Sequence, residues 1–200
     1  LRLTIDIELQ REARRALGAS RGAVVAMDPS NGEVLAMVSN PSFDPNLFVD
    51  GIDHATYSAL RSLKDKPFLN RALHGRYAPG STIKPIFAEV VIEEGIDPEE
   101  SVFCPGWYML PGSTRQYRCW KKTGHGRVDL HAAIEQSCDV YFYEMGKRLG
   151  IGQMSGVLKK FGLGSQSGVD LPGETDGLVP SAEWKLATRN EPWYPGEDLI

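Results

Sequence analysis

The sequence has 200 residues, 42% of them hydrophobic, which is enough for one or two globular domains with a buried core. Its formal net charge of −4 gives no electrostatic reason to expect nucleic acid or an anionic membrane surface as a partner. The sequence contains neither a run of roughly 18 apolar residues, as a membrane span requires, nor a basic-then-apolar signal peptide at its start.

The first part of the chain predicts a helix followed by a β-hairpin. Apolar residues recur near helical spacing over Ile7–Leu17, and Gly18 can end that helix. Gly22–Asp28 is an apolar run that predicts a buried strand, and Glu33–Val38 predicts its partner. The turn residues Pro29–Gly32 between them favour a hairpin connection.

Residues 40–78 are predicted to be irregular, because proline and glycine recur there and no periodic apolar pattern is sustained. Two histidines of this stretch, His54 and His74, are interpreted as ordinary surface or hydrogen-bonded residues rather than catalysts. The Pro79–Gly80 turn then precedes an apolar run, Ile83–Ile92, which predicts a helix closed by a glycine.

Ser81 and Lys84 stand at the start of this helix, three residues apart, so they can share one helix face. Serine is a weak nucleophile until a base takes its proton, and a lysine can be that base. The neighbours of Lys84 are apolar, and a lysine in a largely buried place needs a partner or a function. The other interpretation is an N-cap serine followed by a solvated charge. Ser-x-x-Lys is typical of penicillin-binding proteins and serine β-lactamases.

The second half of the chain predicts mainly helices after a long loop. Residues 101–128 are rich in glycine, proline and aromatic residues and are predicted to form that loop. Asp129 predicts the N-cap of a helix over Leu130–Gln136. The apolar run that begins at Val140 predicts a second helix, residues 152–161 predict a third, and the remainder is predicted to be turn-rich.

Ser137-Cys138-Asp139 is the second group of residues that points to chemistry, at the junction of two predicted helices. Capping side chains at a helix junction are the other interpretation of this tripeptide. Ser-x-Asn, or less often Ser-x-Asp, is the second motif of the penicillin-recognising family, after Ser-x-x-Lys. The order and spacing of the two motifs resemble those of a class B penicillin-binding protein.

The resemblance extends over essentially the whole chain and is to the elongation-type subgroup, penicillin-binding protein 2. Further segments that carry it are Leu3–Asp6 with Gln10, Gly22–Met37, Tyr117–Lys122 with Gly124–Gly126, and Gly168–Glu174. It implies an α+β fold of the penicillin-binding protein and serine β-lactamase type, in which an antiparallel sheet flanked by helices accompanies an all-helical half. We expect residues 1–200 to be the N-terminal part of one transpeptidase domain.

Within that domain, residues 1–40 are expected to form the sheet and helix portion, and 80–165 the helical portion with the motifs. The family's third motif is Lys-Thr-Gly, which Lys122-Thr123-Gly124 spells. That match precedes the second motif and lies in the predicted loop, so we reject it. The genuine motif and the remaining strands of the sheet are expected after Ile200.

The resemblance implies a peptidoglycan D,D-transpeptidase that cross-links stem peptides during cell elongation and is a target of β-lactam antibiotics. It assigns Ser81 as the nucleophile toward D-alanyl-D-alanine, Lys84 as its base and Ser137 as the proton relay to the leaving amine. Asp139 would hydrogen-bond within this network. The implied location is the periplasmic face of the bacterial inner membrane, with an N-terminal anchor outside this sequence. A membrane glycosyltransferase and proteins of the elongation complex are the implied protein partners.

Cys104, Cys119, His125 and Cys138 form a candidate metal site, because three thiolates and an imidazole suit a closed, structural Zn²⁺ site. Some members of the elongation-type subgroup carry a zinc in this loop, which favours zinc. One alternative is a Cys104–Cys119 disulfide with Cys138 free, which a periplasmic location would permit. His131 is an alternative fourth ligand.

Two other functions stay open on the sequence. A serine β-lactamase-like hydrolase would share the fold and the first two motifs, but it needs a base for deacylation, for which the sequence offers no candidate. A non-catalytic, zinc-stabilised cell-wall scaffold would not need Ser81, Lys84 and Ser137, all of which are present.

Overall fold

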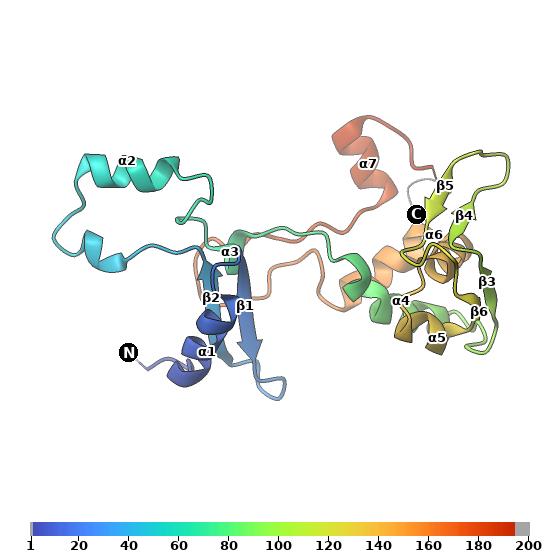
Figure 1. Cartoon of the computed structure of the whole chain (residues 1–200), viewed down its shortest axis with the longest axis horizontal. Helices are drawn as coiled ribbons and strands as arrows, with labels where there is room; N and C mark the ends of the chain where they lie inside the picture. The colour runs from blue at the N-terminus through green and yellow to red at the C-terminus, as the bar shows by residue number, and fades with distance from the viewer. Residues whose placement is uncertain (1, 195–200) are drawn as a thin grey trace. The chain divides into compact units, whose positions relative to one another are not determined.

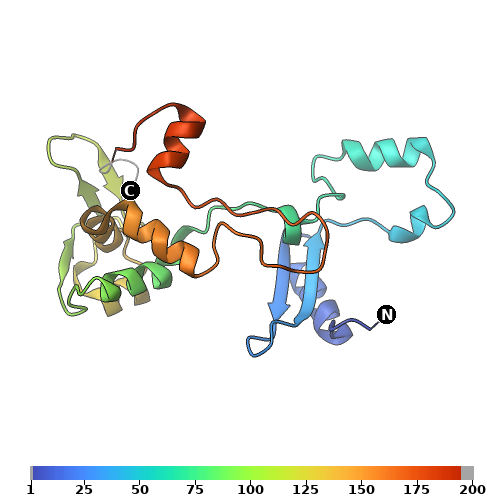
Figure 2. The same ribbon diagram turned by 180° about the vertical axis from the view of Figure 1, so that it is seen from behind.

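The computed structural model describes residues 2–194, which divide into two compact units. Unit 1 comprises Leu1–Tyr77 with Gly168–Thr175, and unit 2 comprises Ala78–Ser167 with Asp176–Ile200. Figures 1 and 2 draw the same ribbon from opposite sides. Over the described residues, no helix has both the length and the apolar character needed to cross a bilayer.

Unit 1 is built on helix α1 (Ile7–Leu17) packed against the antiparallel strands β1 (Gly22–Met27) and β2 (Val34–Asn40). The side chain of Gln10 fixes the helix to β2, because it both donates to Met37 O (2.8 Å) and accepts from Met37 N (2.7 Å). The predicted helix and hairpin are therefore confirmed. The small buried core between them contains Ala13, Ala36 and Val38, with Leu17, Val24 and Ala26 packed against it.

The expectation that the first strand is buried is wrong for half of its residues. Val25 and Met27 are 49% and 60% exposed, whereas Val24 and Ala26 pack on the core. Successive side chains of a strand point to opposite faces, so a hairpin with α1 on one face shows alternate residues to the other. Side chains of the strand alternate between its two faces, and an unbroken apolar sequence does not show which of them are exposed.

Residues 40–78 contain more helix than their prolines and glycines predict. The three short helices are η1 (Pro45–Phe48), α2 (His54–Ser62) and α3 (Arg71–His74). Each begins at an Asx residue whose side chain accepts a hydrogen bond from a backbone N–H of the first turn. The prediction that this stretch is irregular is therefore wrong, because Asx residues at N-cap positions start helices despite the neighbouring prolines and glycines. His54 and His74 are both exposed, as expected of surface histidines.

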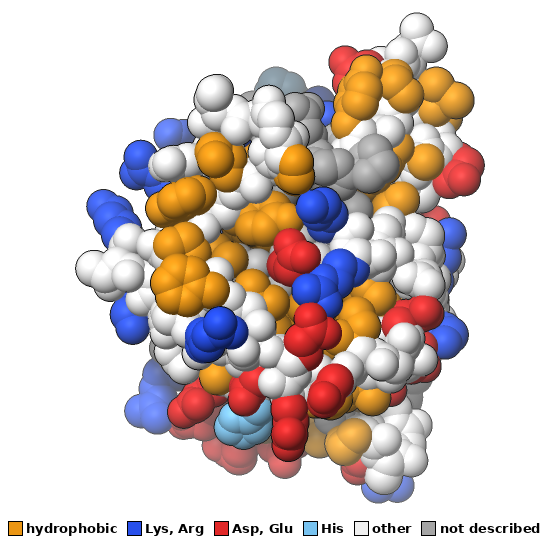
Figure 3. Space-filling model, turned by 90° about the vertical axis from the view of Figure 1, so that its right-hand side faces the viewer, with side chains coloured by type: hydrophobic (Ala, Val, Ile, Leu, Met, Phe, Trp, Pro, Cys, Tyr) orange, Lys and Arg blue, Asp and Glu red, His pale blue; other side chains and the backbone are white. Residues whose placement is uncertain are grey.

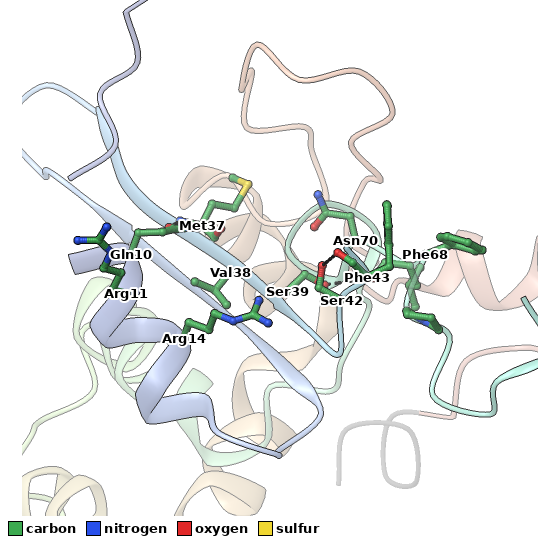
Figure 4. A pocket seen from close by; sticks show the side chains of 12 residues that line it. Gln10, Arg11, Arg14, Met37, Val38, Ser39, Ser42, Phe43, Phe68 and Asn70 are labelled. Atoms are coloured by element: carbon green, nitrogen blue, oxygen red, sulfur yellow. Dashed lines mark hydrogen bonds between the residues drawn. The ribbon is translucent and has the colours of Figure 1, made fainter. Parts of the chain in front are cut away.

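A cavity of about 370 Å³ lies in unit 1 beside α1 and β2 (Figure 4). Arg11 and Arg14 of α1 line one part of it, and Phe43 and Phe68 line another. All of its lining residues belong to unit 1. The Ser-x-x-Lys and Ser-x-Asp motifs at Ser81 and Ser137 lie in unit 2, so this cavity is not the candidate active site.

Unit 2 is a helical core to which a small β-structure is attached. The 3-10 turn η2 (Gly80–Ile83) leads into α4 (Lys84–Glu93), and α5 (Leu130–Glu135) leads into α6 (Asp139–Lys160). Helix α4 packs against α6, and their shared core includes Val91, Tyr141 and Met145. Gly150, at φ 76, interrupts α6 and divides it into the two helices predicted from the sequence. Helix α7 (Ala182–Arg189), in the stretch predicted to be turn-rich, was missed.

The stretch predicted as a loop contains four short strands. They are β3 (Val102–Cys104), β4 (Trp107–Met109), β5 (Gln116–Arg118) and β6 (Gly126–Val128). β3 pairs with β6 and β4 with β5, both antiparallel. Strands of three residues are too short to show a periodic pattern, which explains the error. On the face that Figure 3 shows, apolar side chains gather in groups, and acidic side chains gather toward the lower edge of the view.

Lys122-Thr123-Gly124 lies in a turn between β5 and β6. Lys122 is exposed, whereas Gly124 is buried at φ 81, where an added Cβ would overlap the carbonyl oxygen of Cys104. Only glycine fits so close to a neighbouring backbone in that conformation. The glycine of this match therefore has a structural cause, which agrees with its rejection as a catalytic motif.

Candidate active site and metal centre

Ser81 and Lys84 are placed by the change from a 3-10 turn to an α-helix. Gly80 adopts φ 57, and Ser81 follows it on the exposed turn η2. Lys84 is the first residue of α4, and its backbone N–H donates to Ser81 O. Pro85 fits next to it because the first turn of a helix needs no internal hydrogen bond from that N–H. The nucleophile candidate is thus exposed, while the lysine is only 7% exposed.

All three N–H groups of the Lys84 ammonium donate hydrogen bonds to residues of the second motif, Ser137 and Asp139. Nζ donates to Asp139 Oδ1 (2.6 Å), Ser137 O (2.9 Å) and Ser137 Oγ (3.1 Å). An ammonium has three donors, so these three bonds, none of them to Ser81, satisfy it. A buried cation is tolerated when it is paired in this way. The structure therefore brings together Lys84, Ser137 and Asp139, as the sequence motifs predicted.

Ser137 adopts a backbone conformation that glycine would favour. It follows Gln136, the C-cap of α5, at φ 52. Its N–H donates to Ile134 O (3.1 Å) and the next N–H, that of Cys138, donates to Ala133 O (2.9 Å). This pair of bonds is a Schellman motif, whose left-handed position is usually glycine. A serine there costs on the order of 1 kcal/mol in backbone strain, which is typical of functional sites.

The two carboxylate oxygens of Asp139 bond to two different segments of unit 2. Oδ1 pairs with Lys84, and Oδ2 accepts from the backbone N–H of Trp120 at 3.0 Å. Asp139 is also the first residue of α6, where the positive end of the helix dipole stabilises a carboxylate. Trp120 was not singled out from the sequence, and only its position after Cys119 could have drawn attention to it.

The four predicted metal ligands meet in one place. Their ligand atoms all lie within 4.8 Å of one another, and they come from the ends of β3 and β5, the start of β6 and the N-cap of α6. His125 Nδ1 lies 3.6 Å from both Cys104 Sγ and Cys119 Sγ. Tetrahedral Zn²⁺ with ordinary bond lengths separates its sulfur and nitrogen ligands by about 3.6 Å. The cluster therefore fits a tetrahedral metal ion.

The structure contains neither of the two alternatives to this ligand set, the Cys104–Cys119 disulfide and His131 as the fourth ligand, among the residues it describes. The three cysteines are free thiols, so the Cys104–Cys119 disulfide is absent from the described residues. His131 is exposed on α5 and outside the cluster, in which His125 is the imidazole ligand. His125 lies next to a glycine on either side, which lets its ring turn inward, whereas His131 is fixed by its helix.

Burial sets the protonation of the cluster in the absence of a cation. It raises the pKa of the Cys138 thiol to about 12, with neighbouring Cys104 and Cys119 acting in the same direction. It also lowers the pKa of His125, as does the positive charge of Lys121. Three buried thiolates would repel one another, so the thiolate form needs a compensating positive charge. A divalent metal supplies that charge, since its ligands must be deprotonated.

A Ser-x-x-Lys turn and a Ser-x-Asp tripeptide joined through one lysine are the pair of motifs typical of the penicillin-recognising class, and the comparisons agree. Residues 22–191 match the family model described as the penicillin binding protein transpeptidase domain, and the chain belongs to that family. It is 50% identical over 200 residues to the peptidoglycan D,D-transpeptidase MrdA of Acinetobacter baumannii, covering 100% of this chain and 30% of that protein. The chain thus spans about a third of the length of the curated relatives it matches.

Two solved structures show the same fold. Pseudomonas aeruginosa PBP2, in complex with WCK 5153, is 49% identical with a TM-score of 0.94, covering 99% of this chain and 43% of that one. Helicobacter pylori PBP2 in complex with MreC is 38% identical with a TM-score of 0.93, covering 98% of this chain and 37% of that one. The predicted α+β transpeptidase fold and the resemblance to penicillin-binding protein 2 are therefore confirmed.

Proposed function

We propose that the protein is a D,D-transpeptidase that cross-links peptidoglycan stem peptides through an acyl-enzyme on Ser81. The observation that carries this proposal is the set of three hydrogen bonds from Lys84 to Ser137 and Asp139. A buried amine, three residues after the exposed Ser81 in the chain, shares one network with a hydroxyl and a carboxylate, which supports this role for Ser81. Residues 1–200 would be the N-terminal part of one transpeptidase domain, with 1–40 in its sheet portion and 80–165 in its helical portion.

In this mechanism Ser81 Oγ attacks the carbonyl carbon of the penultimate D-alanine while Lys84, in its neutral amine form, accepts the hydroxyl proton. The amide bond breaks, Ser137 passes a proton to the leaving nitrogen, and the terminal D-alanine departs. An amine of a neighbouring stem peptide then attacks the ester, and the reverse proton transfers release Ser81. The backbone N–H of Ser81 would be one donor to the developing oxyanion. Asp139 would hold the Lys84 amine, which in turn bonds Ser137.

We also propose that the Cys104, Cys119, His125 and Cys138 cluster holds a structural Zn²⁺. Its four protein ligands leave no open coordination position, so the metal would supply charge and cross-linking rather than an activated water. Because Cys138 separates Ser137 from Asp139, the metal would fix the second motif to the β3–β6 segment. We expect Cys138→Ser to lower both the zinc content and the rate of β-lactam acylation; unchanged values of both would contradict this role.

The location and partners follow from the family rather than from this chain's own surface. We propose the periplasmic face of the inner membrane, with peptidoglycan stem peptides as substrates and β-lactams as inhibitors. A membrane glycosyltransferase and elongation-complex proteins would be its partners. The H. pylori PBP2 complex with MreC supports an assembly of this kind.

Intact-protein mass spectrometry of the full-length protein after brief exposure to penicillin tests the activity. A lasting adduct, mapped to Ser81 by digestion and absent from Ser81→Ala, is expected. An adduct that disappears within seconds would identify a β-lactamase-like hydrolase instead. A folded protein that forms no adduct would favour the non-catalytic scaffold.

A further inference from the structure

Trp120 makes two hydrogen bonds to the residues on either side of Ser137-Cys138. Its backbone N–H donates to Asp139 Oδ2 (3.0 Å), and its indole Nε1–H donates to Gln136 O (2.9 Å). The ring also contacts His125 edge-on, with centroids 5.4 Å apart. One residue of the segment between β5 and β6 thus bonds both the residue before the second motif and the last residue of the motif.

The turn at Ser137, which Trp120 contacts on both sides, requires stabilising contacts. Ser137 sits at φ 52, a conformation that an L-residue adopts only where its surroundings enforce it. Gln136 O is one of the carbonyls that the end of α5 leaves without a partner in the helix, and the indole satisfies it. Asp139, on the other side of the turn, would otherwise be free to rotate its carboxylate away from Lys84.

Packing in the hydrophobic core is not the main structural role of Trp120. The residue is 63% exposed, so its ring adds little to the core, and the specific contribution of its side chain lies in the directed hydrogen bond from the indole to Gln136 O. Trp107, in β4 of the same unit, is less exposed at 38%. Because Trp120 bonds the turn at Ser137 and Trp107 lies in β4, the same Trp→Phe change at Trp107 serves as a matched control.

We propose that Trp120 is a positioning residue for acylation: its indole, bound to Gln136 O, fixes the turn that presents Ser137 to Lys84, while its backbone N–H holds the Asp139 carboxylate that pairs with Lys84. This inference rests on the proposed acyltransferase function, because its effect is on the rate at which Ser81 is acylated. It does not depend on Trp120 touching substrate. Its indole acts through Gln136 O and the turn at Ser137, which gives it a specific signature in mutant kinetics.

The test measures penicillin acylation of the full-length, zinc-loaded protein carrying Trp120→Phe, Trp120→Ala or the control Trp107→Phe. Trp120→Phe keeps an aromatic ring but removes the indole donor, and the loss of one hydrogen bond predicts an acylation rate constant about tenfold lower. Trp120→Ala should lose at least as much, and Trp107→Phe should match the wild type. Zinc content and the fraction of protein that is finally acylated should stay unchanged for Trp120→Phe.

A double-mutant cycle separates positioning from folding. If the indole of Trp120 acts by fixing the turn that presents Ser137, Trp120→Phe should change the rate constant less than about twofold in a Ser137→Ala background, because the hydroxyl it positions is gone. A full tenfold loss in that background would overturn the proposal. So would a wild-type rate constant in Trp120→Phe, or a loss explained by missing zinc or a smaller acylated fraction. Failure of the proposed function is a different result, namely no adduct on the wild-type protein.

Discussion

A buried basic side chain of unit 1, Arg71, and one of unit 2, Lys84, are held in different ways. Arg71 in unit 1 is 5% exposed and donates to three backbone carbonyls, those of Asp65, Lys66 and Leu69. Lys84 in unit 2 is 7% exposed and is bound by a carboxylate, a hydroxyl and one carbonyl.

The difference lies in what the acceptors can do. Backbone carbonyls neither titrate nor transfer protons, so Arg71 organises a loop and nothing more. A hydroxyl and a carboxylate can exchange protons with an amine, so the same burial in unit 2 builds a reactive network. Burial of a charge is therefore weak evidence of function by itself, whereas the chemistry of its partners is strong evidence.

The largest expected effect that tests this comparison is on catalysis. Lys84→Met keeps an unbranched side chain of similar size but removes the amine, so penicillin acylation of Ser81 should fall by roughly 10²- to 10⁴-fold, the usual contribution of a general base. Stopped-flow acylation of the full-length protein measures it. A rate within tenfold of wild type would show that Lys84 is not the base.

Arg71→Met is the matched change in unit 1, with an effect on stability instead. It leaves three carbonyl groups without their donor, so the free energy of unfolding should fall by about 2 kcal/mol. Urea denaturation measures that loss. The acylation rate constant of the folded protein should remain that of the wild type, and a large fall in it would break the proposed distinction between the two cations.

A smaller effect should separate the backbone strain at Ser137 from the role of its hydroxyl. Ser137→Gly and Ser137→Ala both remove the hydroxyl and should slow acylation to a similar degree. Only glycine relieves the left-handed conformation, so the glycine variant should be more stable than the alanine variant by about 1 kcal/mol. Equal melting temperatures of the two variants would show that the turn is not strained.

The smallest effect concerns a third charged group, Glu144, which lies between Tyr108 and Arg148. Burial raises the pKa of Glu144, but hydrogen bonds from Tyr108 and Arg148 together outweigh it, so the pKa lies below its usual 4.5. A depressed folded-state pKa means that the carboxylate stabilises the protein above that usual value, and that this contribution is lost as the pH falls through the folded-state value.

Glu144→Gln should therefore make stability less sensitive to acid below about pH 4.5, by less than about 1 kcal/mol because the network is near the surface. Urea denaturation of both proteins between neutral pH and about pH 3.5 measures the difference. Parallel stability curves would show that Glu144 contributes nothing through its charge.

Much of the fold and site followed from local patterns. The helix ended by Gly18, the helix capped by Asp129 and the break at Gly150 were predicted because caps and glycines act within a few residues of themselves. Three errors came from the same source. A strand with an exposed face, three-residue strands, and Asx-capped helices in a proline-rich stretch all have patterns too short or too weak to outweigh composition.

By itself, then, the sequence determined the chemical groups: the Ser-x-x-Lys tetrad at a helix start, the Ser-x-Asp tripeptide at a helix junction, and a set of three cysteines and one histidine. Tertiary structure decided which of these groups meet. Lys84 and Ser137 are 53 residues apart, and packing of α4 on α6 joins them. It also decided that His125 rather than His131 completes the metal cluster, and that Trp120 clamps the second motif. The physical reason is that periodicity and capping are encoded locally, whereas contacts between distant segments exist only once the core between them has packed.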